Sequence, residues 1–205
     1  MGKITEISPQ ARDKTRVNVY IDGAFVCGLS LETAVKHRLK AGAEIDGERL
    51  KEIEFDSERH TALEKAAAHI SKAMKTEREL TLFLSRKGYS DAVVSFIAEK
   101  FKGYGYIDDA AYAAAYVSAH SAKKGARLIK AELRAKGVKD ADIDAALSAL
   151  PAATDAAKAV AAKYMRGKGR DAKEIQKLYR HLLSKGFSYD EAAAAAEEYR
   201  ECREF

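Results

Sequence analysis

The sequence has no tryptophan, two prolines and two cysteines among its 205 residues. Scarce proline leaves long helices uninterrupted. Cys27 and Cys202 lie far apart in the chain and match neither a secreted disulfide scaffold nor paired Cys-x-x-Cys zinc spacing. No apolar run approaches the ~18 residues of a membrane span, and the N-terminus lacks the hydrophobic stretch of a signal peptide. We therefore expect a soluble, helix-rich protein in the reducing cytoplasm, without a membrane partner.

The most informative feature that is present is a repeat. Lys-Gly pairs place Gly88, Gly137 and Gly186 at two equal intervals of 49 residues. Apolar residues stand eight and four positions before each glycine and directly after it. A glycine that ends a helix in the left-handed conformation brings the last two of these positions into contact in a Schellman motif. Each repeat is therefore predicted to contain an amphipathic helix that ends at its glycine. The apolar positions are Leu80, Leu84 and Tyr89; Ile129, Leu133 and Val138; and Leu178, Leu182 and Phe187.

A period of 49 residues suits three helices of about a dozen residues with short connections. We expect another helix after each glycine, capped by Ser90, Asp140 or Ser188, the last with a capping-box glutamate three residues on. Its apolar residues are Val93, Ile97 and Phe101; Ile143, Leu147 and Leu150; and Ala192, Ala195, Ala196 and Tyr199. The third helix lies upstream, with predicted cores of Leu63, Ala66 and Ile70; Tyr112, Ala115 and Tyr116; and Ala157, Val160 and Tyr164.

The N-terminal segment has a different period. Apolar and polar residues alternate from Arg16 to Leu29 on both sides of Asp22-Gly23, a strong two-residue turn signal, and predict a β-hairpin. Short strands are expected at residues 4–7 and 53–55, with a helix from about Leu31 to Lys40 that stops at Gly42.

The expected architecture is therefore mainly α, with three tandem three-helix repeats in an elongated array behind a small subdomain that contains the hairpin. The predicted boundaries are residues 1–57 for the N-terminal segment and 58–106, 107–155 and 156–205 for the three repeats.

Positive charge is concentrated in the helical body. Residues 1–60 carry 10 basic and 11 acidic residues, whereas residues 120–186 carry 16 basic and seven acidic ones. Spacings of three and four residues place many of these cations on one helix face, and the repeat aligns several of them. A ridge of this kind suits phosphates or an acidic protein groove. The candidate contact residues are Lys75, Arg78, Lys123, Lys124, Arg127, Lys130, Arg134, Lys173, Lys177 and Arg180.

For any single helix, a solvated charged face explains these cations equally well; the repetition and the local excess favour binding. The helices that follow Gly137 and Gly186 are acidic, which argues against a helix-turn-helix protein that inserts them into the DNA major groove. Tyr104, Tyr106, Tyr112 and Tyr116 suit base stacking, but Tyr112 and Tyr116 are better explained as core, and Asp108 or Asp109 as a helix cap.

No catalytic or metal-binding motif stands out. The five histidines form no HExxH pair, and no GxxxxGK[ST] loop is present. The basic loop of residues 166–170, Arg-Gly-Lys-Gly-Arg, could contact phosphate, although a solvated linker explains it as well. We expect no enzyme, no cofactor and no metal.

Several stretches resemble the RecX family, the regulators of the RecA recombinase. They are residues 103–117, 123–127 and 132–138 in the centre, residues 185–191 in the third repeat and residues 74–80 in the first. The hairpin is similar to the N-terminal extension of some members. Ala111 departs from the family's polar first turn of the central motif, whereas Tyr112 supplies its aromatic residue.

The resemblance implies a non-enzymatic modulator that binds the RecA–DNA filament and restrains its ATPase and strand exchange, in recombination, DNA repair and the SOS response. The partners would be RecA and single- or double-stranded DNA, with the protein as a monomer. Two alternatives stay open: a stand-alone nucleic-acid-binding protein that contacts phosphates without RecA, and a structural adaptor without DNA affinity.

Overall fold

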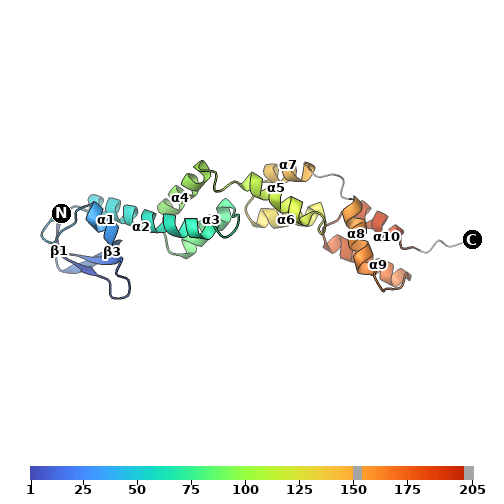
Figure 1. Cartoon of the computed structure of the whole chain (residues 1–205), viewed down its shortest axis with the longest axis horizontal. Helices are drawn as coiled ribbons and strands as arrows, with labels where there is room; N and C mark the ends of the chain where they lie inside the picture. The colour runs from blue at the N-terminus through green and yellow to red at the C-terminus, as the bar shows by residue number, and fades with distance from the viewer. Residues whose placement is uncertain (150–153, 201–205) are drawn as a thin grey trace, which may run out of the picture. The chain divides into compact units, whose positions relative to one another are not determined.

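The structure is a computed structural model that describes residues 1–149 and 154–200. The chain forms two compact units. Unit 1 comprises residues 1–73 and 80–106, and unit 2 comprises residues 74–79 together with the chain from Ile107 onward. The protein is mainly helical with a small N-terminal antiparallel sheet, as expected (Figure 1).

The sheet in unit 1 has four strands, β1 (Gly2–Pro9), β2 (Arg16–Ile21), β3 (Ala24–Ser30) and β4 (Glu44–Ile45), in the order β3-β2-β1-β4. The predicted hairpin is confirmed. Asp22 and Gly23 have φ values of 50° and 80°, and a turn with two positive φ values matches the twist of the strands that it joins. The inner face of the sheet buries Ile4, Val17, Val19 and Leu29.

The helix after the hairpin is shorter than expected. It is α1 (Leu31–Lys36), and it ends well before Gly42. Arg38 adopts the left-handed conformation at φ 53°, and the backbone N–H groups of Arg38 and Leu39 bond to the carbonyls of Val35 and Ala34. Arg38 thus stands where a glycine normally ends a helix. Gly42, at φ 92°, instead donates its N–H to Ile4 and starts the approach to β4.

Residues 53–55 are not a strand, contrary to the prediction. They lie in α2 (Gly47–Ile70), which begins where the Asp46 carboxylate accepts the Arg49 N–H at 2.7 Å. Three alternating residues fit a helix as well as a strand, and here Ile53 is buried against the sheet. The expected boundary after residue 57 lies within α2; the domain boundaries stay a prediction.

Each of the three repeat glycines ends a helix, as predicted. The helices are α3 (Glu77–Arg86), α6 (Ala126–Ala135) and α9 (Ala172–Ser184). Gly88, Gly137 and Gly186 have φ values of 84°, 88° and 85°. In all three, the glycine N–H bonds to the carbonyl three residues back and the next N–H to the carbonyl five residues back. These are the two hydrogen bonds of the Schellman motif. The paired leucine and isoleucine positions before each glycine are buried.

The flanking helices are α4 (Asp91–Gly103), α5 (Asp109–His120), α7 (Asp140–Ser148), α8 (Thr154–Met165) and α10 (Tyr189–Glu197). Val93, Ile97 and Phe101 are buried as predicted, as are the alanines expected at the core of α10: Ala192, Ala195 and Ala196. Leu150 lies outside the described residues.

The predicted cores of the upstream helices are confirmed in part: Ala66 and Ala157 are buried as expected, whereas Leu63, Ile70, Val160 and Tyr164 are half-buried. The buried residues are Ala62 and Ala66 in α2, Ala113 and Val117 in α5, and Ala157, Ala161 and Met165 in α8. The expected Ala115 is exposed, and Tyr112 and Tyr116 are half-buried beside the core. Small side chains let neighbouring helices approach closely, whereas the tyrosines lie at the edge, where a hydroxyl can reach a polar partner.

Two of the four predicted caps form as expected. Asp108 accepts the Ala111 N–H at 2.9 Å, and Ser188 forms a complete capping box with Glu191. Ser90 occupies the N-cap position, but its hydroxyl donates to Glu58. Asp140 is not the cap, since Lys139 occupies that position and Asp140 is the first helical residue.

Two end-to-end helix contacts, which we call junctions, repeat in unit 2. At the first, the N-terminus of α6 meets the C-terminus of α9: the Gly125 N–H donates to the Lys185 carbonyl at 2.9 Å and the Arg127 N–H to the Gly186 carbonyl at 3.2 Å. Unpaired amides at one helix end thus meet unpaired carbonyls at another. The backbones are so close that a Cβ atom on Gly125 would lie 2.2 Å from the Gly186 oxygen.

The second junction is the same contact one repeat earlier. The start of α3 meets the end of α6, where the Thr76 hydroxyl donates to the Lys136 carbonyl at 2.7 Å. A Cβ atom on Gly137 would lie 2.6 Å from the Arg78 Cβ atom. Thr76 and Arg78 are the equivalents of Gly125 and Arg127, 49 residues apart. The repeat therefore preserves a helix-to-helix contact as well as a helix ending.

The junctions predict different costs for three alanine substitutions. Gly88→Ala introduces only left-handed strain, since no atom lies within 4 Å of the new Cβ, and we expect a loss of about 1 kcal/mol. Gly125→Ala, at φ −74°, introduces crowding without strain. Gly186→Ala combines both and should be the most destabilising, by about 1–3 kcal/mol more than Gly88→Ala. Urea denaturation followed by circular dichroism measures each loss; equal losses for Gly88→Ala and Gly186→Ala would contradict the junction.

A partly buried carboxylate, Asp56, links α1 to α2 in unit 1. Asp56 accepts hydrogen bonds from Lys36 Nζ at 2.7 Å and His37 Nε2 at 3.0 Å, and it also pairs with Arg59. Burial raises the pKa of Asp56, but these hydrogen bonds and the Arg59 charge outweigh it and hold the pKa at about 2. The folded-state pKa is thus below the unfolded-state value of about 3.9.

A depressed carboxylate pKa stabilises the fold above the unfolded-state pKa, and this contribution is lost as the pH falls towards about 2. We expect Asp56→Asn to lower stability at pH 7 by about 1–2 kcal/mol and to flatten the decline in melting temperature between pH 4 and pH 2. Thermal unfolding at several pH values tests this. A variant with the wild-type slope would show that other carboxylates dominate acid unfolding. Asp22→Asn is the control.

A candidate basic interaction surface

The ten predicted contact residues all belong to unit 2, and we call them the basic surface. They are Lys75, Arg78, Lys123, Lys124, Arg127, Lys130, Arg134, Lys173, Lys177 and Arg180. They come from three places: the start of α3, α6 with the turn before it, and α9. Each place contains or adjoins a helix that ends at a repeat glycine.

Lys124 is held by a local network rather than presented to solvent. Its Nζ donates to both Glu132 carboxylate oxygens, at 2.6 and 2.7 Å, and the Tyr116 hydroxyl donates to Glu132 at 2.8 Å. The hydrogen bond to Glu132 raises the pKa of Lys124. Burial raises the pKa of Glu132, but the Lys124 and Tyr116 hydrogen bonds outweigh it and the net shift is downward. Both groups stay charged, and the lysine's charge is largely compensated.

Two further cations of α6 pair with the acidic helix α7. Lys130 Nζ lies 2.5 Å from an Asp144 oxygen, and Arg134 makes two hydrogen bonds to Asp140, at 2.6 and 2.9 Å. The side chains of Arg134 and Asp140 are each 54% exposed, so this pair contributes little to stability. Its main effect is on the charge of the surface. The acidic residues of α7, which argue against insertion of this helix into the DNA major groove, partly neutralise the neighbouring cations of α6.

The cations of α9 are less compensated. Lys177 pairs with Glu174 one turn earlier, at 2.5 Å, whereas Lys173 and Arg180 are exposed. Among the described residues, the ion pairs of the basic surface involve Lys124, Lys130, Arg134 and Lys177, and none involves Lys75, Lys123, Arg127, Lys173 or Arg180. The exposed members of the second group, Lys123, Arg127, Lys173 and Arg180, are therefore the part of the basic surface with the most available charge, whereas Lys75 is half-buried.

Arg78 and Arg127 occupy equivalent positions at the two junctions. The Arg78 side chain packs against Gly137, and the Arg127 guanidinium lies 5.5 Å from the centre of the exposed Tyr189 ring. Each arginine is therefore placed beside the C-terminal end of the next repeat's glycine-ended helix. The third equivalent is Gln176, which lies on α9.

The sequence reasoning missed Lys136, which stands one residue before a repeat glycine. Its Nζ lies 2.6 Å from Glu79 and 5.5 Å from the centre of the Tyr112 ring. The hydrogen bond to Glu79 raises the pKa of Lys136. Burial raises the pKa of Glu79, but the bonds from Lys136 and the Thr76 N–H outweigh it, so the net shift is downward. Lys136 thus holds the second junction. The sequence signal that could have identified it is the lysine that stands directly before each repeat glycine.

Nowhere in the part of the chain that the structure describes do three or more histidine, cysteine, aspartate or glutamate side chains gather as metal ligands. Each helix there is too short or too polar to cross a lipid bilayer.

The fold defines the class of protein: tandem three-helix domains behind a small N-terminal sheet domain. The sequence matches the family descriptions "Regulatory protein RecX N-terminal domain" over residues 2–46, "RecX, second three-helix domain" over residues 108–147 and "RecX, third three-helix domain" over residues 153–195. The chain belongs to the RecX family of regulatory proteins.

Similar proteins agree with this assignment. A regulatory protein RecX from Bacillus licheniformis is 34% identical over 206 residues, covering 97% of this chain and 78% of that protein. One from Clostridium perfringens is 35% identical, covering 93% of this chain and 92% of that protein. A crystal structure of regulatory protein RecX superimposes with a TM-score of 0.67 at 29% identity, and one of RecX from Lactobacillus salivarius with 0.63 at 25%. They cover 96% and 69% of this chain, and 100% and 96% of their own.

The ion pairs between α6 and α7 predict that removal of the Asp144 charge strengthens polyanion binding more than removal of the Asp142 charge does. Asp144→Asn releases Lys130, whereas Asp142→Asn makes the same change in net charge at a residue for which no cation partner occurs among the described residues. We expect Asp144→Asn to elute from heparin at a higher salt concentration than Asp142→Asn, and both later than wild type. Equal shifts would show that total charge matters and that the ion pair does not.

Proposed function

We propose that the protein is a non-enzymatic regulator of the RecA recombinase that binds the RecA–DNA filament through the basic surface. Membership of a family of regulatory proteins supports the regulatory role. The proposed effect is inhibition of RecA ATP hydrolysis and strand exchange, exerted by a monomer in the cytoplasm during recombination and DNA repair. The partner surface is the polyanionic filament, whose DNA phosphates attract lysine and arginine.

The observation that carries the choice of surface is the repeat register. Equivalent positions on successive repeats hold Lys75, Lys124 and Lys173, and Arg78 and Arg127 occupy equivalent junctions. A partner with a repeating surface, such as a helical filament on DNA, can contact equivalent positions in the same way. Scattered surface charge has no such register.

Within the basic surface, the cations without a carboxylate partner should dominate binding. Lys123, Lys173 and Arg180 are exposed and lie in unit 2. A paired lysine must share its charge with an aspartate or glutamate, whereas an unpaired one releases counterions fully when it meets a phosphate.

The test is a titration of RecA ATP hydrolysis on single-stranded DNA. Wild type should lower the rate, and Lys123→Gln/Lys173→Gln/Arg180→Gln should need roughly tenfold more protein for the same effect, since three phosphate contacts are lost. Arg12→Gln/Lys14→Gln/Lys51→Gln removes the same charge from exposed positions of unit 1 and serves as the matched control.

Three outcomes separate the alternatives. An unchanged RecA rate at saturating wild-type protein refutes the proposed function. Equal loss in the variant and its control refutes the basic surface as the contact. Salt-sensitive binding to DNA, with no capture of RecA in a pull-down, supports a stand-alone nucleic-acid-binding protein instead.

A further inference from the structure

A second group of cations lies outside the basic surface, in the loop of residues 166–170 between α8 and α9. The loop contains Arg166, Lys168 and Arg170, separated by single glycines, and all five residues are exposed. Gly167 has a φ of 75°, and the Lys168 N–H bonds to the Met165 carbonyl at 2.9 Å. Across the described residues, no carboxylate lies within ion-pair distance of these three side chains.

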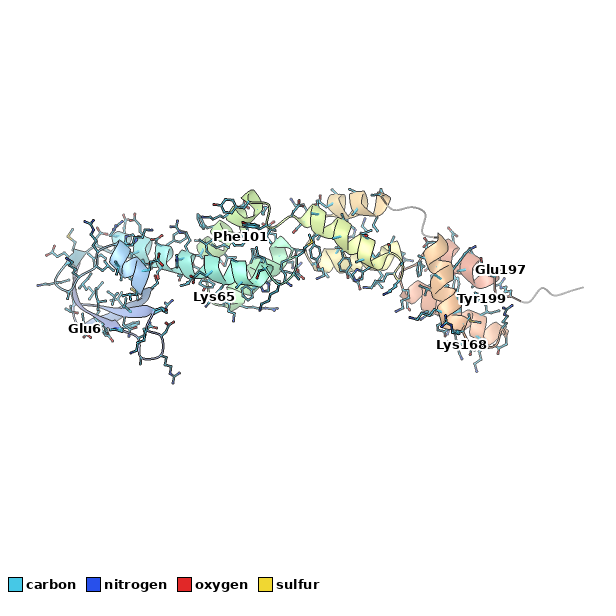
Figure 2. All side chains as sticks on the ribbon, in the orientation of Figure 1. Glu6, Lys65, Phe101, Lys168, Glu197 and Tyr199 are labelled. Carbon is cyan, nitrogen blue, oxygen red and sulfur yellow. The ribbon has the colours of Figure 1, made fainter. Side chains whose placement is uncertain are left out.

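The loop borders an open hollow of about 250 Å³, and the described residues that line it include these three cations and no acidic side chain. Tyr199 forms part of the wall, and its ring centre lies 5.7 Å from the Arg170 guanidinium. The Lys168 Nζ lies 3.1 Å from the centre of the Tyr164 ring, which stacks on His181. Three residues are labelled in this region, Lys168, Glu197 and Tyr199, and they belong to the same end of unit 2 (Figure 2). Two tyrosine rings therefore pack against cations of the loop, Tyr164 against Lys168 and Tyr199 against Arg170.

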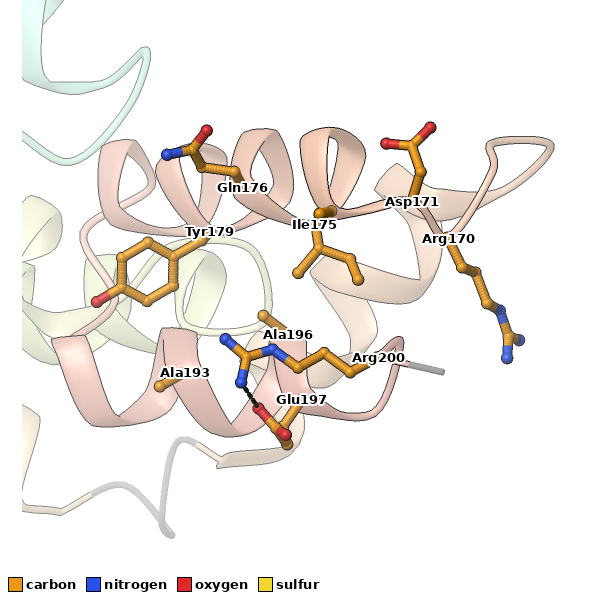
Figure 3. A pocket seen from close by; sticks show the side chains of 10 residues that line it. Arg170, Asp171, Ile175, Gln176, Tyr179, Ala193, Ala196, Glu197 and Arg200 are labelled. Carbon is orange, nitrogen blue, oxygen red and sulfur yellow. Dashed lines mark ion pairs between the residues drawn. The ribbon is translucent and has the colours of Figure 1, made fainter. Parts of the chain in front are cut away.

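A larger groove of about 1050 Å³ lies between α9 and α10, and Arg170 stands at the border of both hollows. Ile175, Tyr179, Ala193 and Ala196 line its apolar part. Figure 3 shows Arg200 extended along the groove, with its guanidinium bonded to Glu197 at 2.9 Å, whereas Arg170 points away from the groove. The groove is thus lined by apolar and aromatic side chains on one part and by charged ones, Asp171, Glu197 and Arg200 among them, on another.

We propose that this loop and groove bind single-stranded nucleic acid, with a backbone phosphate in the smaller hollow and an adjoining base in the groove. Three cations that have no carboxylate partner among the described residues suit a phosphate. Tyr179 and the apolar lining suit the face of a base. Asp171, which caps α9 by accepting the Glu174 N–H, and Glu197, which pairs with Arg200, line the groove, and their carboxylates disfavour a phosphate there. A duplex keeps its bases stacked and paired, so only a single strand can place a base in the groove.

This site lies outside the ten residues of the basic surface, and its test requires no RecA. The proposed nucleic-acid site can therefore be refuted while RecA regulation holds, and RecA regulation can be refuted while the nucleic-acid site holds.

The test is fluorescence anisotropy of the full chain with a fluorescein-labelled oligothymidylate at 50 and 200 mM salt. Arg166→Gln/Lys168→Gln/Arg170→Gln should bind at least about tenfold more weakly at the lower salt, with a salt dependence reduced by about two logarithmic units per logarithmic unit of salt. The control is again Arg12→Gln/Lys14→Gln/Lys51→Gln, which should bind within about twofold of wild type. Unchanged affinity in the loop variant, or equal loss in the control, overturns the proposal.

A second variant tests the base in the groove. Tyr179→Leu should weaken binding several-fold without changing the salt dependence, because stacking involves no counterion release. Phe25→Leu, at an exposed aromatic residue of unit 1, is the control, and thermal unfolding verifies that both variants fold. Wild-type affinity for Tyr179→Leu overturns the base-binding groove.

Two further ligands distinguish the sources of the phosphate. A blunt duplex of the same length that binds as tightly as the single strand, with equal loss in the loop variant, overturns the single-strand assignment. Calorimetry with inorganic phosphate completes the test. Phosphate binding that the loop variant loses, without any loss of oligonucleotide affinity, identifies free phosphate as the ligand and overturns nucleic acid.

Discussion

The end-to-end contact between glycine-ended helices is the constraint on which unit 2 depends. At each junction, amide or hydroxyl donors at the start of one helix meet the last carbonyls of another, as Gly125 and Arg127 meet Lys185 and Gly186. Buried backbone groups need such partners, and the approach leaves no room for a side chain. The glycine therefore has two separate tasks: it permits the left-handed helix ending, and it admits the neighbouring helix. Gly88 performs only the first among the described residues.

The junctions also determine how positive charge is distributed. They place Arg78 and Arg127 at helix ends and hold Lys136 against Glu79. Packing of α6 against α7 then brings Lys130 and Arg134 to aspartates. Cations at similar positions in a helix sequence therefore differ in whether a nearby carboxylate compensates their charge. Lys123, Lys173 and Arg180 keep theirs, and the loop of residues 166–170 keeps three more at a hollow that no acidic side chain lines among the described residues.

Sequence periodicity predicted the hairpin and the glycine-ended helices because their signals are local: a turn dipeptide, or a glycine with two apolar neighbours at defined spacing. It misplaced the buried face of α5, where Ala113 and Val117 are buried in place of Ala115. In an alanine-rich helix several faces are equally apolar, and only the partner helices select one. The short pattern at residues 53–55 was equally ambiguous, and burial of Ile53 under the sheet decided it.

The sequence by itself determined the period of 49 residues, the helix endings, the positions of the cations and the family. Each of these depends on residues that lie close together in the chain. Only the tertiary structure decided which cations are paired, because Arg134 finds Asp140 and Lys136 finds Glu79 through helix packing. The groove beside Arg170 also depends on the tertiary structure, because α9 and α10 each supply one wall and neither helix forms the groove alone.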